Sequence, residues 1–139
     1  MTDDGRQWLA RAVLMAVLLA NLSAAIPYVA RPADYVTAYE LAGAPGEVMV
    51  RGLGILFLMW AVPFIPAILQ PMRNRVAFTC VLAMQVIGLA GESLMMATLP
   101  PGHGALSATG WRFIAFDGAG LVLLSLGYLV TQRGPGKTE

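Results

Sequence analysis

Two acids and two arginines fall within or at the edge of long apolar segments, and their chemistry stands out in this chain. Glu92 and Asp117 are carboxylic acids, whereas Arg51 and Arg112 carry permanent positive charge. An unpaired charge in hydrocarbon costs at least ~2.5–3.5 kcal/mol, so such side chains are functional candidates by default. Two carboxyl groups in one dry pocket can hold different protonation states, one as general acid and one as base. This pair suits isomerisation, cyclisation or epoxide opening on a lipophilic molecule, with the arginines orienting the substrate.

Four more residues share the predicted faces or the depth of the acids. Gln85 lies seven residues before the first acid and Phe113 four before the second, so each pair shares one helix face. Asn21 lies in the same half of the first apolar segment, and Trp60 lies near the middle of the second. All four are therefore predicted to contact the substrate, with Trp60 at the floor of the pocket.

The same four charges have a structural interpretation. Arg112 and Asp117 are five residues apart, roughly 140° around a helix, so they cannot pair along one helix. Arg51 with Asp117 and Arg112 with Glu92 is one arrangement between helices, and the exchanged pairing is the other. Ion pairs of this kind would fix helix register without catalysis. They would also keep both acids ionised, which would remove the general acid.

The elements that must position these residues are four apolar segments, at residues 8–28, 48–70, 76–99 and 106–130. Each is long enough to cross a bilayer as a helix, which takes ~20 residues. Apolar residues make up 58% of the chain and charged residues only 12%, against roughly 25% in soluble domains. We therefore predict an all-α, integral membrane four-helix bundle, with residues 1–139 as a single domain and residues 132–139 as a flexible tail. Pro63 and Pro66 should kink the second helix.

The connections between these segments are short. The longest, residues 30–47, contains a predicted amphipathic interfacial helix at residues 34–41. His103 lies in a Pro/Gly-rich turn and is predicted to be a solvated loop histidine, while Ser107 or Thr109 could cap the fourth helix. Three tyrosines are assigned to anchoring at the membrane interface: Tyr28, Tyr35 and Tyr39.

Orientation follows from the distribution of Lys and Arg in the short flanks and loops. One side would hold most of them, namely Arg6, Arg11, Arg73, Arg75, Arg133 and Lys137. The other side would hold only Arg31 in its loops. Both termini are therefore predicted to be cytoplasmic, which places the polar residues of all four helices in the outer half of the membrane.

Composition also limits the partners. With 9 Lys and Arg against 8 Asp and Glu, the chain has no basic field for a nucleic acid. It has one histidine and a single cysteine, Cys80, in no metal-binding motif, so no metal or cofactor is predicted. The expected partners are membrane lipid and a lipophilic small molecule.

The start of the second segment, Arg-Gly-Leu-Gly-Ile-Leu-Phe-Leu at residues 51–58, together with the four-helix layout, resembles small bacterial inner-membrane proteins of the DoxX-like kind. The resemblance implies a four-helix bundle in a bacterial inner membrane and assigns no reaction. Two other functions stay open. One is binding or transport without chemistry, for which so small a protein would act as an oligomer such as a homodimer. The other is an accessory subunit of a larger membrane complex.

Overall fold

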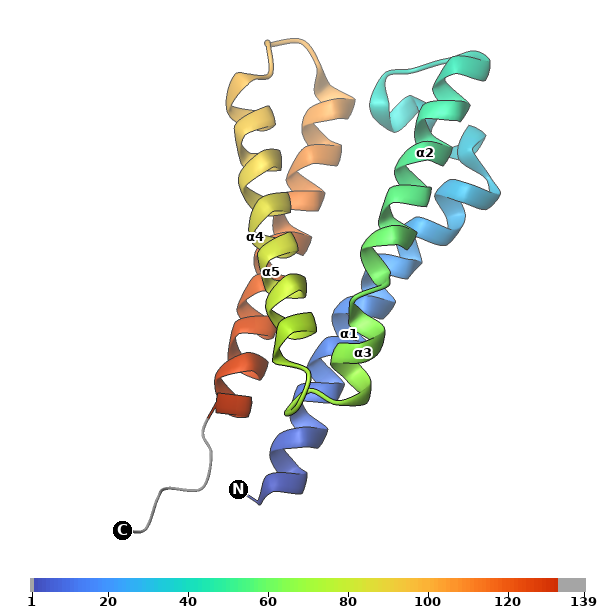
Figure 1. The fold of residues 1–139 in the computed structure, drawn as a ribbon. Helices are drawn as coiled ribbons and strands as arrows, with labels where there is room; N and C mark the ends of the chain where they lie inside the picture. The colour runs from blue at the N-terminus through green and yellow to red at the C-terminus, as the bar shows by residue number, and fades with distance from the viewer. Residues whose placement is uncertain (1, 133–139) are drawn as a thin grey trace.

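The computed structural model describes residues 2–132, and this part of the chain is all-helical (Figure 1). The elements are α1 (Asp3–Ala30), the 3-10 helices η1 (Pro32–Asp34) and η2 (Val36–Tyr39), α2 (Gly43–Ala61), α3 (Phe64–Leu69), α4 (Arg75–Thr98) and α5 (Gly104–Gln132). Four helical stretches are long and apolar enough to cross a membrane: α1, α2 with α3, α4 and α5. Most of the predicted tail, including Arg133 and Lys137, lies outside the described residues.

Helices α1 and α4 begin before the predicted apolar segments, and a polar side chain caps the start of each. The Thr2 hydroxyl accepts a hydrogen bond from the Gly5 amide (3.3 Å) and starts α1. The Asn74 side chain does the same for the Ala77 amide (3.3 Å) at the start of α4. Each cap satisfies an amide that has no partner within its helix. Hydropathy therefore locates the apolar part of each helix but not its ends.

The second apolar segment is not one continuous helix. Helix α2 ends at Ala61 and α3 begins at Phe64, so the break falls at Pro63, where a kink is predicted. Proline has no amide hydrogen, so it cannot donate the bond that would continue the helix. Pro66 causes no second break because it lies in the first turn of α3, where a missing amide donor is tolerated.

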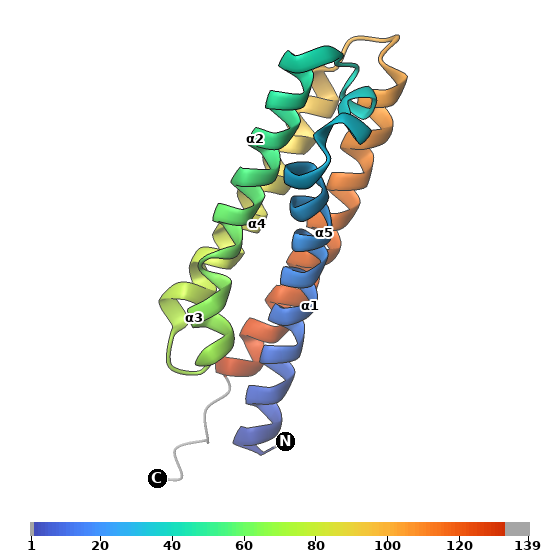
Figure 2. The ribbon, with the colours of Figure 1, turned by 90° about the vertical axis from the view of Figure 1, so that its right-hand side faces the viewer.

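The helices pack as two pairs, α1 with α2 and α4 with α5 (Figures 1 and 2). The pairs meet where α1 packs on α5, and the short α3 packs on both α1 and α4. We call the end where α1 begins and α5 ends the terminal end. The opposite end, with η1, η2 and the α4–α5 turn, is the loop end. Figure 1 shows the two pairs diverging toward the loop end.

The packed core lies in the terminal half of the bundle. Its fully buried side chains include Leu14, Phe64, Phe78 and Leu124, one from each of the long helical stretches. Arg11 adds polar contacts there, donating to the carbonyl oxygens of Ile68 (3.1 Å) and Leu69 (2.8 Å), and so satisfies the end of α3.

Close packing within the α1–α2 pair depends on Gly54. A Cβ there would lie 2.8 Å from the Tyr28 Cβ and 2.9 Å from the Ala25 carbonyl oxygen, so no larger residue fits without movement. Small residues of this kind let two helix backbones approach closely, and in lipid such packing replaces the hydrophobic drive.

The α1–α2 connection differs from its prediction. In place of one amphipathic helix at residues 34–41, the chain forms the two 3-10 turns η1 and η2, separated at Tyr35. The second turn ends because Glu40 adopts the left-handed conformation, with φ 54°. A residue in this region cannot continue a right-handed helix, so η2 stops at Tyr39.

Candidate functional site

A cavity of about 300 Å³ lies between the two helix pairs, in the loop half of the bundle. Side chains from α1, α2, α4 and α5 line it, and residues of the α1–α2 connection close part of its loop end. Val17 and Phe64 form its floor, where the packed core begins. The volume is at the lower end of the range for small-molecule sites. Seven of the eight predicted site residues line this one cavity: Asn21, Trp60, Gln85, Glu92, Arg112, Phe113 and Asp117.

Asp117 is held in a fixed position deep in this cavity. Its side chain is 5% exposed, and the Gln85 amide donates to its Oδ1 (2.9 Å) and to its main-chain oxygen (3.2 Å). Gln85 itself is 2% exposed, so this bond lies inside the bundle. The buried residues of α4 run through Phe78, Val81 and Gln85, which directs this face of α4 toward α5.

Two glycines make room for the Asp117–Gln85 pair. A Cβ on Gly88 would overlap Asp117 Oδ2 and lie 2.8 Å from the Trp60 Cη2 atom. A Cβ on Gly120 would lie 2.7 Å from Gln85 Nε2. The carboxyl group and the edge of the indole ring are therefore neighbours across the bare face of Gly88. Side chains at either glycine would push these groups apart.

Glu92 is the second acid of the cavity, two helical turns beyond Gln85 on the same face of α4. Its Oε2 atom is buried and has no hydrogen-bond partner among the described residues. Native proteins rarely leave a buried polar atom unpartnered, and each such atom needs an explanation. A hydrogen-bond donor from a ligand, or a proton bound to this carboxyl group, would account for the oxygen that has no partner among the described residues.

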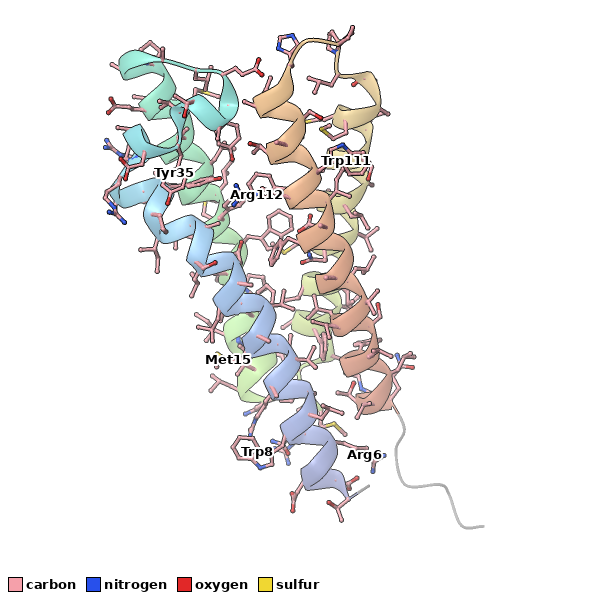
Figure 3. All side chains as sticks on the ribbon, turned by 180° about the vertical axis from the view of Figure 1, so that it is seen from behind. Arg6, Trp8, Met15, Tyr35, Trp111 and Arg112 are labelled. Carbon is pink, nitrogen blue, oxygen red and sulfur yellow. The ribbon has the colours of Figure 1, made fainter. Side chains whose placement is uncertain are left out.

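The predicted ion pairs do not form. Within residues 2–132, the pairs closer than 4.0 Å join residues near the helix ends: Arg6 to Asp3, Arg31 to Asp34 and His103 to Glu40. Arg112 lines the cavity at its loop end, but it is exposed and bonds to neither acid. Figure 3 shows Arg112 reaching from α5 into the space between the helix pairs, on the side of Tyr35. The prediction that arginines neutralise both acids is therefore wrong.

Arg51 is a further correction. It is exposed and does not line the cavity. The buried face of α2 runs through Gly46, Val50 and Gly54, four residues apart, and packs against α1. Arg51 is about 100° around the helix from Val50 and so points out of the bundle. Its position in the sequence does not determine the side of α2 on which it lies.

The remaining predicted residues contribute in different ways. Asn21 donates to the Phe57 carbonyl oxygen (2.9 Å), so its amide joins α1 to α2 at the cavity wall. Phe113 packs against Phe57 across the two helix pairs, with ring centroids 5.8 Å apart. Trp60 lies against Gly88 and joins α2 to α4.

Several cavity residues were not predicted as site residues. Five of them are aromatic: Tyr28, Tyr35, Phe57, Phe64 and Phe116. Tyr28 is only 7% exposed, so the assignment of this tyrosine to interfacial anchoring is wrong. The signal that could have found them is helical spacing, since Phe57 precedes Phe64 by seven residues and Phe113 lies three before Phe116.

Polar contacts close the loop end of the cavity. The Tyr39 and Tyr28 hydroxyls share a hydrogen bond (3.0 Å) beside it. Burial, this hydrogen bond and the nearby Glu92 raise the pKa of Tyr39, which Arg112 partly counteracts. Thr109 does not cap α5 but donates to the Ala38 carbonyl oxygen (2.8 Å), which ties η2 to α5.

Glu40 makes the other connection at the loop end. One carboxylate oxygen accepts from His103 Nδ1 at 2.6 Å, and the other accepts from the amides of Ala105 (3.2 Å) and Leu106 (3.4 Å). The hydrogen bond from His103 lowers the pKa of Glu40, and the amides add to this effect. Glu40 thus caps α5 from another part of the chain, and His103 is a partner of this contact rather than a free loop histidine.

Residues 2–132 hold no group of three His, Cys, Asp or Glu side chains that could bind a metal ion. Comparisons of the chain with protein-family models, with curated proteins and with solved structures found no match.

Proposed function

We propose that this protein is an integral membrane enzyme that performs acid/base chemistry on a lipophilic substrate in the cavity between its helix pairs. The observation that carries the proposal is that Glu92 and Asp117 line one cavity and that no arginine of residues 2–132 forms an ion pair with either. Unneutralised acids in a water-poor site are the arrangement that general acid–base catalysis uses.

The contacts of the two acids suggest separate roles. Asp117 accepts a hydrogen bond from Gln85, which suits a carboxylate that serves as base or stabilises positive charge. Glu92 has an oxygen without a donor and so suits a protonated carboxyl group that gives its proton to the substrate. Two negative charges in one apolar cavity repel each other, which also favours a pair that holds one proton.

A balanced reaction follows from these roles. Glu92 adds its proton to a carbon–carbon double bond or to an epoxide oxygen, and positive charge develops on an adjacent carbon. Loss of a proton from a neighbouring carbon to Asp117 completes an isomerisation. In a cyclisation, a second double bond of the substrate first attacks the positive carbon, which closes the ring and moves the charge, and Asp117 then takes the proton. In epoxide opening, a water molecule attacks that carbon and gives its proton to Asp117. The proton then returns from Asp117 to Glu92 through water or substrate.

The membrane setting belongs to the same proposal. The four apolar helices would cross a bilayer, with the terminal end in the cytoplasm, because Arg6, Arg11, Arg73 and Arg75 lie there. The cavity would then lie in the outer half of the membrane. The resemblance of residues 51–58 to DoxX-like proteins supports a bacterial inner membrane.

A transport function has less support. The packed core around Leu14, Phe78 and Leu124 fills the terminal half of the bundle below the cavity. A transported molecule would have to pass through this core, whereas an enzyme needs access from one side or from the lipid. A binding protein without chemistry would use the same cavity but would not need both acids.

The test compares apolar metabolites extracted from cells that lack the gene and carry wild type, Glu92→Gln, Asp117→Asn or Arg51→Gln. Mass spectrometry should find two compounds of equal composition, or compounds that differ by one water, whose ratio depends on the wild-type protein. Arg51→Gln should restore this ratio because its side chain is outside the cavity. Loss of general acid–base catalysis lowers a reaction rate about 10²–10⁴-fold. The two acid variants should therefore fail to restore the ratio. Full restoration by both, at equal protein levels, would refute the enzyme.

A further inference from the structure

We propose that the cavity binds a lipophilic organic cation, with its positively charged group beside Asp117 and Glu92 and its apolar body among the aromatic rings. This inference deepens the proposed function and rests on the same cavity: it names the charge of the ligand. A bound ammonium group would imitate the positive charge that develops on the substrate.

The charges of the cavity are separated along its length. Arg112 and Asp117 are five residues apart on α5, which places the acid about 7.5 Å deeper along the helix axis. Arg112 is exposed at the loop end, whereas Asp117 is 5% exposed. No Lys, Arg or His of the described residues lies within 4.0 Å of either acid. The deep part of the cavity is therefore negative and lacks a cation.

Both acids have acceptor capacity that the protein leaves unused. Gln85 occupies Asp117 Oδ1, while Oδ2 lies over the bare face of Gly88 without a hydrogen-bond donor from residues 2–132. Glu92 Oε2 is buried and equally lacks a donor. A ligand that brings a hydrogen-bond donor and a positive charge would satisfy both atoms.

Aromatic rings make up most of the other large side chains of the cavity. They come from α1, the α1–α2 connection, α2, α3 and α5: Tyr28, Tyr35, Phe57, Trp60, Phe64, Phe113 and Phe116. Several stack in sequence, with centroids 4.7 Å apart for Tyr28 and Tyr35 and 6.1 Å apart for Tyr28 and Phe57. The faces of such rings attract cations, and this attraction is strongest at desolvated sites.

Other ligand classes fit less well. An anion would be repelled by the two acids in the deep part of the cavity and could use only Arg112 at its entrance. A neutral hydrocarbon would fill the aromatic space but would leave the free oxygens of Asp117 and Glu92 without partners. A cation with an apolar body uses both halves of the lining.

Trp60 provides a reporter for this site. Trp8 and Trp111 are exposed, at 68% and 61%, so Trp8→Phe and Trp111→Phe should leave the fold intact and make Trp60 the only indole. This variant, in nanodiscs of zwitterionic lipid, is titrated with N,N-dimethyl-3-phenylpropylamine, which is a cation at neutral pH. The controls are (4-methylpentyl)benzene, its neutral isostere, and 4-phenylbutanoate, an anion. Empty nanodiscs correct for partitioning into lipid.

The amine should change Trp60 fluorescence in a saturable way, and neither control compound should compete with it. Asp117→Asn and Glu92→Gln should each weaken amine binding at least about tenfold, the equivalent of ~1.4 kcal/mol. Arg51→Gln serves as the matched control and should bind normally. Glu92→Gln removes no hydrogen bond to another side chain or amide of residues 2–132, so it should fold even if Asp117→Asn does not. Equal binding of the isostere, or amine binding unchanged in Glu92→Gln, would overturn the proposal.

The result is separable from that of the metabolite experiment. If the amine binds and the acid variants restore the metabolite ratio, the cation site stands and the enzyme fails. If the amine does not bind and the acid variants lose the ratio, the enzyme stands and the cation site fails. If the amine both binds and blocks turnover, both proposals gain support.

Discussion

Gly88→Ala is the sharpest test of the geometry around the two acids. A Cβ at this position would overlap Asp117 Oδ2 and lie 2.8 Å from Trp60 Cη2, so one of the two groups must move. Overpacking of this kind costs about 1–3 kcal/mol. Replacing glycine by alanine inside a helix also stabilises by about 0.5–1 kcal/mol, which would mask part of that cost.

Gly91→Ala removes this ambiguity. Gly91 lies less than one turn further along α4, and a Cβ there would meet nothing within 4 Å. Both variants gain the same helix propensity, so the difference between their free energies of unfolding isolates the packing cost. We therefore expect Gly88→Ala to be about 1–3 kcal/mol less stable than Gly91→Ala. The free energy of unfolding of Gly91→Ala should equal or exceed that of wild type.

The assay is unfolding by sodium dodecyl sulfate in mixed micelles, followed by far-ultraviolet circular dichroism. Trp60 fluorescence in the variant without the other two tryptophans gives a second, local readout. Gly88→Ala should shift the emission of Trp60, whereas Gly91→Ala should not. Equal stability of the two variants, with Trp60 emission unchanged in both, would show that Asp117 and Trp60 do not meet at Gly88.

Three other predictions follow from the helix contacts and the loop end. Gly54→Ala should cost about 1–3 kcal/mol in the same unfolding assay because α1 leaves no space there, whereas Gly52→Ala, where a Cβ meets nothing within 4 Å, should be neutral. The His103 hydrogen bond lowers the pKa of Glu40. The contact therefore stabilises the folded protein fully above the ordinary pKa of a glutamate, and this stabilisation is lost as the pH falls through the lowered pKa. As the pH is lowered below about 4, the temperature of the unfolding midpoint of wild type should therefore decrease, and that of Glu40→Gln should lack this decrease. Parallel plots of midpoint temperature against pH for the two proteins would exclude the contact. With Cys80 replaced by alanine, the thiol introduced by His103→Cys should react with an impermeant maleimide added outside the cell. Failure of this thiol to react from outside would reverse the orientation.

The sequence predicted the helices and the depth of the polar residues better than their directions. Apolar length identifies the four long helical stretches, and the seven-residue spacing correctly placed Gln85 and Glu92 on one face. The ion pairs failed because periodicity fixes positions around one helix but not the rotation of that helix against its neighbours. Arg51 lies on the outer side of α2, which its position in the sequence did not indicate.

The loop end was the least predictable region. Its key contact, Glu40 with His103 and the first amides of α5, joins residues more than sixty positions apart. No local pattern announces such a cap, since the usual rules look for a capping side chain just before the helix. The left-handed conformation of Glu40 is equally absent from propensity rules, which assign that geometry to glycine or asparagine.

The uneven packing of the bundle has a mechanical consequence. Interlocked side chains join the two helix pairs near the terminal end, while hydrogen bonds through Glu40 and Thr109 and the contact between Phe57 and Phe113 join them in the loop half. The two helix pairs are thus joined firmly near the terminal end and more lightly near the loop end. Separating the two pairs at the loop end would break these hydrogen bonds and the contact between Phe57 and Phe113, and would leave Leu14, Phe78 and Leu124 in place. A ligand could therefore enter or leave the cavity without disturbing the packed core that positions Glu92 and Asp117.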